Sequence, residues 1–199
     1  MSAQTLASLR DLVPLRPLSP VEAFSVAEQQ ALRLTGAGRS PMDGPVDDRL
    51  VGDLGFVRVL RGSTATAQAG STWERGKWTI LLNANDAPAR QRFSLAHELK
   101  HILDYRFFKL IYAGIPADYI DQWREDVANY FAACVLMPRP WVKHAWGNGV
   151  QCVDLLADQF AVSQIAMRIR LVQLGLVDPQ PRHAPFQTIS SARRTRPRR

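Results

Sequence analysis

The spacing of apolar and polar positions predicts a helix near the amino terminus, followed by a loop. Residues 19–22 read Ser-Pro-Val-Glu, a capping box with proline at the first helical position. The helix is expected to run to about Thr35 and to end at Gly36, because glycine readily adopts the left-handed conformation that closes helices. Residues 36–48 are rich in Gly, Pro and Asp and predict a loop, and residues 49–54 predict a further short helix.

Alternation with a period of two residues predicts two strands, at residues 56–60 and 78–82. Residues 73–76 predict a turn just before the second strand, and residues 64–69 are candidates to pair with it. Long helical patterns follow these strands. The sequence therefore predicts an α+β fold in which a small sheet packs on helices.

The segment after the strands carries an apolar stripe at helical spacing and is expected to form a helix that ends near Tyr105. Asp86 is predicted to cap this helix, and Pro88 is tolerated in its first turn. The stripe consists of Phe93, Ala96, Leu99, Ile102 and Leu103.

Helical patterns continue through the rest of the chain. A second long helix is predicted to be capped by Asp118 and to stop at Pro138, followed by a Trp-rich linker. Two short helices are then expected at residues 153–160 and 164–174, with Ser163 as the cap of the second. This order resembles a helix-turn-helix. The favoured interpretation is that the two helices only complete the hydrophobic core, because the chain without its carboxyl-terminal tail is almost neutral and is poorly suited to contact the phosphates of DNA.

Composition narrows the class of protein. The chain has 199 residues, of which 46% are hydrophobic and 22% charged, as in an ordinary globular protein. There is no apolar run long enough to span a bilayer and no secretory signal, so we expect no membrane contact and a cytoplasmic location. Cys134 and Cys152 are too few for a disulfide framework and are predicted to be small buried residues.

The positive charge is concentrated at the carboxyl end. Six arginines and no acidic residues lie in residues 180–199, so the net charge of +7 falls to +1 without them. This basic tail is predicted to be disordered. The tail either makes a weak contact with a nucleic acid or with an acidic partner, or only keeps the protein in solution without a specific target.

The predicted helix before Tyr105 contains the sequence HELKH, which matches the H-E-x-x-H pattern of zinc peptidases. On a helix, positions four residues apart share a face, with Cβ atoms about 5–6 Å apart, so His97 and His101 can bind one metal ion. Glu98 lies about 100° round the helix axis, where its carboxylate can reach a metal-bound water as general base.

A catalytic zinc site usually has three protein ligands, and HELKH supplies two. The position ten residues after His97 holds Phe107, which excludes the long metzincin pattern. The third ligand must therefore come from elsewhere in the chain. The second long helix offers Asp121, Glu125 and Asp126, and weaker candidates are His144 and His183.

Three stretches together make the pattern specific: RFSLAHELKHIL at residues 92–103, EDVANYFAA at residues 125–133, and LMP at residues 136–138. The chain resembles the ImmA/IrrE family of metallopeptidases over about residues 20–177. A departure is Lys100, where family members often carry glycine, and its side chain is expected to face away from the ligands.

The resemblance implies a zincin-like α+β fold with a C-terminal helical, helix-turn-helix-like segment. It also implies Zn2+ as cofactor, a gluzincin-like site with Glu125 as third ligand, and cytoplasmic cleavage of helix-turn-helix repressors of mobile-element or stress genes. The expected organisation is a lead-in at residues 1–18, a metallopeptidase core at 19–137, a helical segment at 138–178 and the basic tail at 179–199.

The sequence thus favours a zinc-dependent endopeptidase that uses Glu98 as catalytic base. One alternative is a non-proteolytic regulator that binds DNA or a repressor, and another is a toxin-like component of a two-gene module. Retention of Glu98 opposes the first alternative, because a structural metal site needs no general base. The residue that stabilises the oxyanion stays open among Tyr105, Tyr112, Asn129 and His144.

Overall fold

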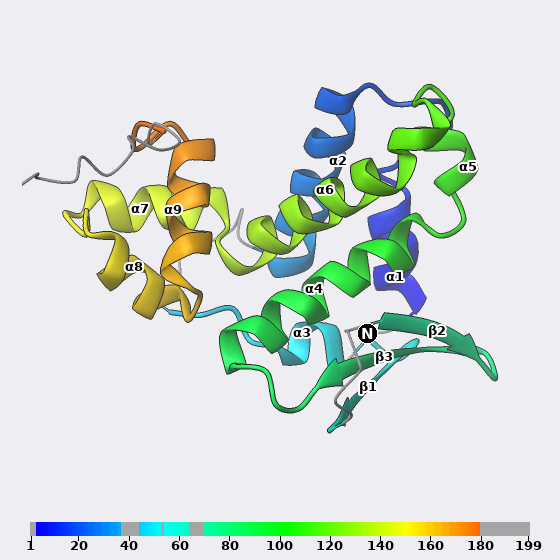
Figure 1. Cartoon of the computed structure of the whole chain (residues 1–199), viewed down its shortest axis with the longest axis horizontal. Coiled ribbons are helices and arrows are strands. Elements are labelled where there is room, and N and C mark those ends of the chain that lie inside the picture. Colours follow the sequence, from blue (N-terminus) through cyan, green and yellow to red (C-terminus); the bar gives the residue numbers. More distant parts are fainter. Residues whose placement is uncertain (1–2, 37–43, 53, 64–69, 180–199) are drawn as a thin grey trace, which may run out of the picture.

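Three strands and a larger set of helices make up the part of the chain that the computed structural model describes, residues 3–36, 44–52, 54–63 and 70–179 (Figure 1). The fold is α+β and mostly helical, with helices at its carboxyl end. The elements are α1 (Ala3–Arg10), α2 (Pro20–Thr35), α3 (Arg49–Gly52), β1 (Val57–Gly62), β2 (Gly70–Glu74), β3 (Lys77–Asn83), α4 (Pro88–Asp104), α5 (Phe108–Ile111), α6 (Ala117–Leu136), α7 (Arg139–Gly147), α8 (Val153–Phe160) and α9 (Gln164–Gln173).

The sheet has the strand order β1-β3-β2, with β1 parallel and β2 antiparallel to β3. A two-residue turn joins β2 to β3, and both Arg75 and Gly76 have positive φ, as the tight turns of twisted hairpins require. Trp78, Ile80 and Leu82 of β3 are buried and alternate with more exposed neighbours, because successive side chains of a strand point to opposite faces. Both predicted strands are therefore confirmed, while residues 64–69 lie outside the described part of the chain.

Helix α4 lies between the sheet and α6, and α2 packs on the other side of α6 (Figure 1). The apolar stripe predicted for α4 supplies Leu99, Ile102 and Leu103, all fully buried. Phe131 of α6 and Ile80 of β3 are also fully buried in the same core. The helix with HELKH is thus held on two sides by apolar packing, which fixes the direction of its polar face.

The segment predicted as a lead-in contains helix α1, which packs against the core. Leu9 is fully buried. Arg10 donates hydrogen bonds to the backbone oxygens of Ile102, at 2.7 Å, and Leu103, at 3.2 Å. These carbonyls lie in the last turn of α4, where a helix leaves its oxygens without partners, so α1 helps to close the helix that carries HELKH.

Several local predictions are confirmed. Ser19 forms the capping box of α2 with Glu22, and Gly36 ends that helix with a φ of 65°. Ser163 caps α9, accepting a hydrogen bond from the backbone N–H of Ala166 at 3.2 Å. In each case the signal and its partner lie within one helical turn, where sequence patterns are most informative.

Two predicted caps and one predicted linker are wrong. Helix α4 starts after Ala87 and α6 after Pro116, without a side-chain cap, so Asp86 and Asp118 do not cap them. The Trp-rich linker is instead α7, an amphipathic helix that buries Trp141. Cys134 is buried as predicted, but Cys152 is exposed, and both thiols are free.

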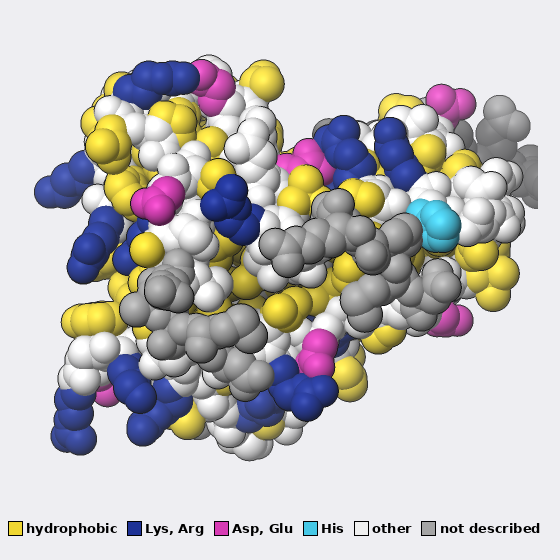
Figure 2. Space-filling model, turned by 180° about the vertical axis from the view of Figure 1, so that it is seen from behind, with side chains coloured by type: hydrophobic (Ala, Val, Ile, Leu, Met, Phe, Trp, Pro, Cys, Tyr) yellow, Lys and Arg dark blue, Asp and Glu magenta, His cyan; other side chains and the backbone are white. Residues whose placement is uncertain are grey.

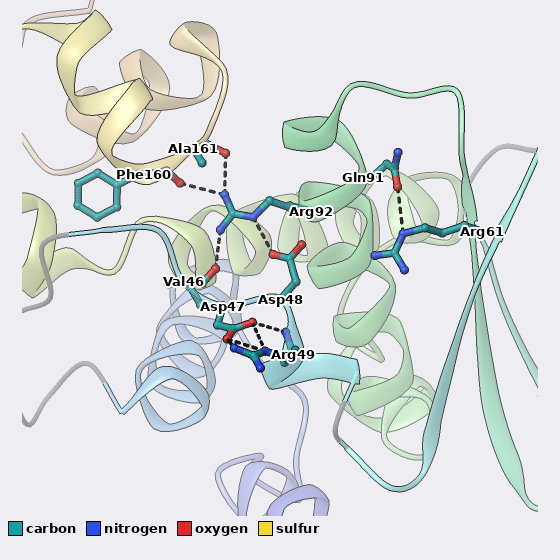
Figure 3. A network of polar contacts seen from close by, with 9 residues as sticks. All are labelled: Val46, Asp47, Asp48, Arg49, Arg61, Gln91, Arg92, Phe160 and Ala161. Atoms are coloured by element: carbon teal, nitrogen blue, oxygen red, sulfur yellow. Dashed lines mark hydrogen bonds and ion pairs between the residues drawn. The ribbon is translucent and has the colours of Figure 1, made fainter.

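The C-terminal helices α7, α8 and α9 lie at one end of the α4–α6 pair (Figure 1). Arg92, in the second turn of α4, joins the two parts (Figure 3). Its guanidinium pairs with Asp48 at 2.7 Å and donates to the backbone oxygens of Val46 at 2.6 Å, Phe160 at 3.1 Å and Ala161 at 2.7 Å. One side chain therefore ties α4 to the loop before α3 and to the end of α8.

The surface carries charges of both signs. On the face drawn in Figure 2, Lys and Arg side chains lie in separate groups, with acidic and hydrophobic side chains between them. No helix in the described ranges is long and apolar enough to cross a membrane. The basic tail falls almost wholly on residues 180–199, which are outside those ranges.

Candidate metal centre

His97 and His101 come together with Glu125 where α4 crosses α6. The two histidine Nε2 atoms are 3.0 Å apart. One carboxylate oxygen of Glu125 is 3.2 Å from His97 Nε2, and the other is 3.3 Å from His101 Nε2. The potential ligand atoms of all three residues lie within 4.8 Å of one another. Two imidazoles and one carboxylate are the donor set of a known class of catalytic zinc sites, so these residues fit a metal ion.

The surroundings of both histidines suit ligation. Burial, and then the neighbouring His97, lower the pKa of His101 to about 4, although the Glu125 carboxylate opposes this. The His101 imidazole is therefore neutral at pH 7 and keeps a lone pair. His97 Nδ1 is 3.0 Å from the amide oxygen of Asn129, which can only accept a hydrogen bond. This contact places the His97 proton on Nδ1 and leaves Nε2 free to bind a metal.

Glu98 opens into the same pocket but does not join the ligand cluster. Burial raises the pKa of its carboxyl group, and a hydrogen bond with Ser71 of β2 acts in the opposite direction. The pocket has a volume of about 870 Å³ and is lined by His97, Glu98, His101, Glu125, Ser71 and Asn129, among others. A carboxylate with a raised pKa beside a pair of histidines has the properties of a general base.

The other proposed ligands lie elsewhere. Asp121 has 92% of its side chain exposed and pairs with Arg124 at 3.3 Å. Asp126 accepts a hydrogen bond from Gln122 and is not part of the three-residue cluster. His144 is exposed on α7, and His183 lies outside the described residues.

The sequence pattern of the IrrE N-terminal-like domain, a peptidase family, matches residues 57–172 of this chain. The chain belongs to this family. The match includes both histidines of HELKH, Glu98 and Glu125, and also α7, α8 and most of α9. The resemblance inferred from the sequence is therefore confirmed.

Curated relatives of this IrrE-like chain include two radiation response metalloproteases named IrrE. The protein from Deinococcus radiodurans is 38% identical over 64 residues, which are 31% of this chain and 20% of the relative. The protein from Deinococcus deserti is 26% identical over 125 residues, which are 61% of this chain and 44% of the relative. The chain thus matches less than half the length of either protein.

A solved structure also shares this fold. A Mycobacterium tuberculosis transcriptional regulator superposes with a TM-score of 0.58 at 18% sequence identity, covering 84% of this chain and 51% of the regulator. At this identity the likeness concerns the fold.

Two polar residues of this IrrE-like site have roles that sequence reasoning missed. Asn129 appeared only as a candidate for oxyanion stabilisation, but it holds His97. Its position four residues after Glu125 on the same helix could have indicated that the two face one site. Ser71 gave no local signal, because its place beside Glu98 depends on how β2 pairs in the sheet.

Lys100, the departure from the family pattern, points away from the ligands as expected. Its ammonium group is buried and donates to Asp104 at 2.7 Å and to Gln30 of α2 at 2.9 Å. Tyr112 donates to the second oxygen of Asp104 at 2.9 Å, and burial raises the pKa of this phenol. A lysine is tolerated within the metal-binding motif because this network satisfies it.

Proposed function

We propose that this chain is a zinc-dependent endopeptidase in which His97, His101 and Glu125 hold the metal and Glu98 is the catalytic base. The observation that carries the proposal is the three-ligand cluster beside a buried glutamate in one pocket. Family membership supports the same reading, since the family is one of peptidases.

Zinc, when bound, polarises the scissile carbonyl and lowers the pKa of a water molecule toward 7. The protein residues do the rest. Glu98 accepts the proton of the attacking water and passes it to the leaving nitrogen, for which a raised pKa is an advantage. Asn129 keeps the His97 ring oriented. Glu125 offsets part of the metal charge, which the two neutral imidazoles cannot do.

The position of β2 supports a polypeptide substrate. Among the described strands β2 is an edge strand, and its residue Ser71 lines the metal pocket. An extended peptide can add to such an edge through backbone hydrogen bonds. The proposed substrate is a helix-turn-helix repressor, as the resemblance to the ImmA/IrrE family implies. The proposed catalytic core is residues 19–137, with residues 138–178 packed on it.

The test uses purified protein loaded with zinc and a helix-turn-helix protein encoded beside its gene. The wild type should cleave this neighbour, and cleavage should stop when a chelator removes the metal. Glu98→Gln should keep the zinc content and melting temperature of the wild type but lose cleavage, because the amide cannot accept a proton. Asp158→Asn, the same carboxylate-to-amide change at an exposed position on α8, is the matched control and should cleave normally.

Two results would contradict the assignment of Glu98: loss of zinc from Glu98→Gln, or undiminished cleavage by it. Tight binding of the neighbouring protein without cleavage by the wild type would favour the alternative of a non-proteolytic regulator.

A further inference from the structure

A second pocket, the α9 groove, lies between α2, α4, α6 and α9 and has a volume of about 870 Å³. Its lining is largely apolar and includes Tyr130 and Ala133 of α6 and Ile165, Ala166 and Ile169 of α9. Concave apolar surfaces of this size are typical of binding sites. The groove is separate from the ligand cluster, and the chemistry proposed above makes no use of it.

The α9 groove adjoins the metal pocket. Arg90, Phe93 and Asn129 line both. The ring centroids of Phe93 and His97 are 6.5 Å apart, and Asn129 holds His97 directly. A molecule bound at the metal pocket therefore lies close to residues that also line the groove.

Helix α9 turns two large apolar side chains outward. Ile165 is 74% exposed and Ile169 is 53% exposed, and their spacing of four places them on one face. Isoleucine cannot form the hydrogen bonds by which proteins read base edges in DNA. Arg170 of the same helix is fully buried and bound to Glu28 and to the backbone oxygen of Met137, which removes it from phosphate contact. The face of α9 that carries Ile165 and Ile169 is thus suited to an apolar partner rather than to a nucleic acid.

We propose that the α9 groove binds apolar side chains of the substrate polypeptide next to the scissile bond and so selects where the chain is cut. This inference rests on the proposed peptidase function. The occupant follows from the shared lining, because a polypeptide held with one peptide bond at the metal pocket lies against Phe93, which also lines the groove. Isoleucine side chains at its far wall then determine which residues are accepted.

The experiment uses hydroxamates, which bind zinc, as probes of the zinc-loaded full chain. Acetohydroxamate reports on the metal site alone. The sequences Lys-Leu-Leu-Leu and Lys-Gly-Gly-Gly, each with the hydroxamate at the carboxyl end or at the amino end, extend about 13–14 Å from the metal in either chain direction. Dissociation constants are measured by titration calorimetry.

In at least one direction the leucine probe should bind tenfold or more tightly than the glycine probe. The double variant Ile165→Ser/Ile169→Ser should remove most of this gain without changing the affinity for acetohydroxamate. Leu155→Ser is the matched control, since Leu155 is 60% exposed on α8 and does not line the groove, and it should change neither affinity. All these side chains are exposed, so the variants should fold.

Equal binding of the leucine and glycine probes in both directions would overturn the inference, as would a gain that survives in the double variant. In either case, normal binding of acetohydroxamate would still support the metal site of the proposed peptidase. Failure of acetohydroxamate to bind would refute both proposals.

Two other occupants would also overturn the inference. If deleting residues 180–199 raises the affinity for the leucine probe tenfold, the carboxyl-terminal segment itself fills the groove. If the wild type is a dimer by sedimentation and the double variant is a monomer, a second copy fills it.

Discussion

Replacing Arg92 by methionine tests whether one side chain holds the C-terminal helices on α4. Methionine keeps much of the apolar stem of arginine but has no donors. The substitution leaves three backbone oxygens and the Asp48 carboxylate without the partner that Figure 3 shows. Only 10% of the Arg92 side chain is exposed, so water can replace the guanidinium only in part.

The expected loss of stability can be worked from these contacts. A hydrogen bond from a charged donor contributes about 1.5–3 kcal/mol, and the three bonds to backbone oxygens dominate. Asp48 is 38% exposed, so solvent screens its ion pair, which adds about 0–1 kcal/mol. Allowing for partial replacement by water, Arg92→Met should lower the free energy of unfolding by about 3–5 kcal/mol, in the range found when one partner of a buried charge pair is removed.

Urea unfolding followed by circular dichroism measures this loss. Asp48→Asn, which removes only the screened pair, should cost about 1 kcal/mol or less. Arg61→Met is the control, because Arg61 is exposed and makes one side-chain contact, with Gln91 at 3.2 Å (Figure 3). If Arg92→Met costs no more than Arg61→Met, the bonds to the α8 end and the loop before α3 do not hold these parts together, and the reasoning fails.

Three further predictions concern the metal site, the thiols and a helix cap. Glu125→Ala should shrink the zinc-induced rise in melting temperature, because a site that binds zinc a hundredfold more weakly loses about 2.7 kcal/mol of the stabilisation that zinc provides. Asp121→Ala should keep the full rise. The opposite result for the two variants would contradict the ligand assignment. Iodoacetamide should modify Cys152 in the native protein but Cys134 only after unfolding, since burial raises the pKa of Cys134 to about 11. Mass spectrometry identifies the modified residue, and modification of Cys134 in the native protein would contradict this prediction. Hydrogen bonds with Arg16 and Ser19 lower the pKa of Glu22 from 4.5 to about 2, so its stabilising effect should be complete above about pH 4.5 and lost as pH falls toward 2; an unchanged stability difference from Glu22→Gln between pH 6 and 2.5 would contradict this.

The proximity of His97 and His101 and the local elements could be predicted because their signals are short-range. A spacing of four residues puts His97 and His101 on one helix face whatever the rest of the chain does. Ser19 and Ser163 act within a single turn, so their caps were predicted correctly. Asp86 and Asp118 do not act as caps because Ala87 and Pro116, which have no side-chain acceptor, occupy the N-cap positions of α4 and α6. Asp86 lies one residue before its cap position and Asp118 two residues after it, so the sequence signal was misplaced by one or two residues.

Distances between elements could not be read from the sequence. Residue patterns alone left Glu125 as one of three acidic candidates on its helix, and the family resemblance singled it out. The crossing of α4 and α6 is what brings its carboxylate within 3.2–3.3 Å of both histidines. The same crossing sets Asn129 against His97, and sheet pairing sets Ser71 beside Glu98. Such contacts depend on how whole helices and strands pack against one another in the core. A single segment of the sequence carries no periodic pattern that reports this packing. The α9 groove was likewise decided only by the tertiary structure, because its walls come from four helices. The sequence gives the order of these helices along the chain but not their relative positions.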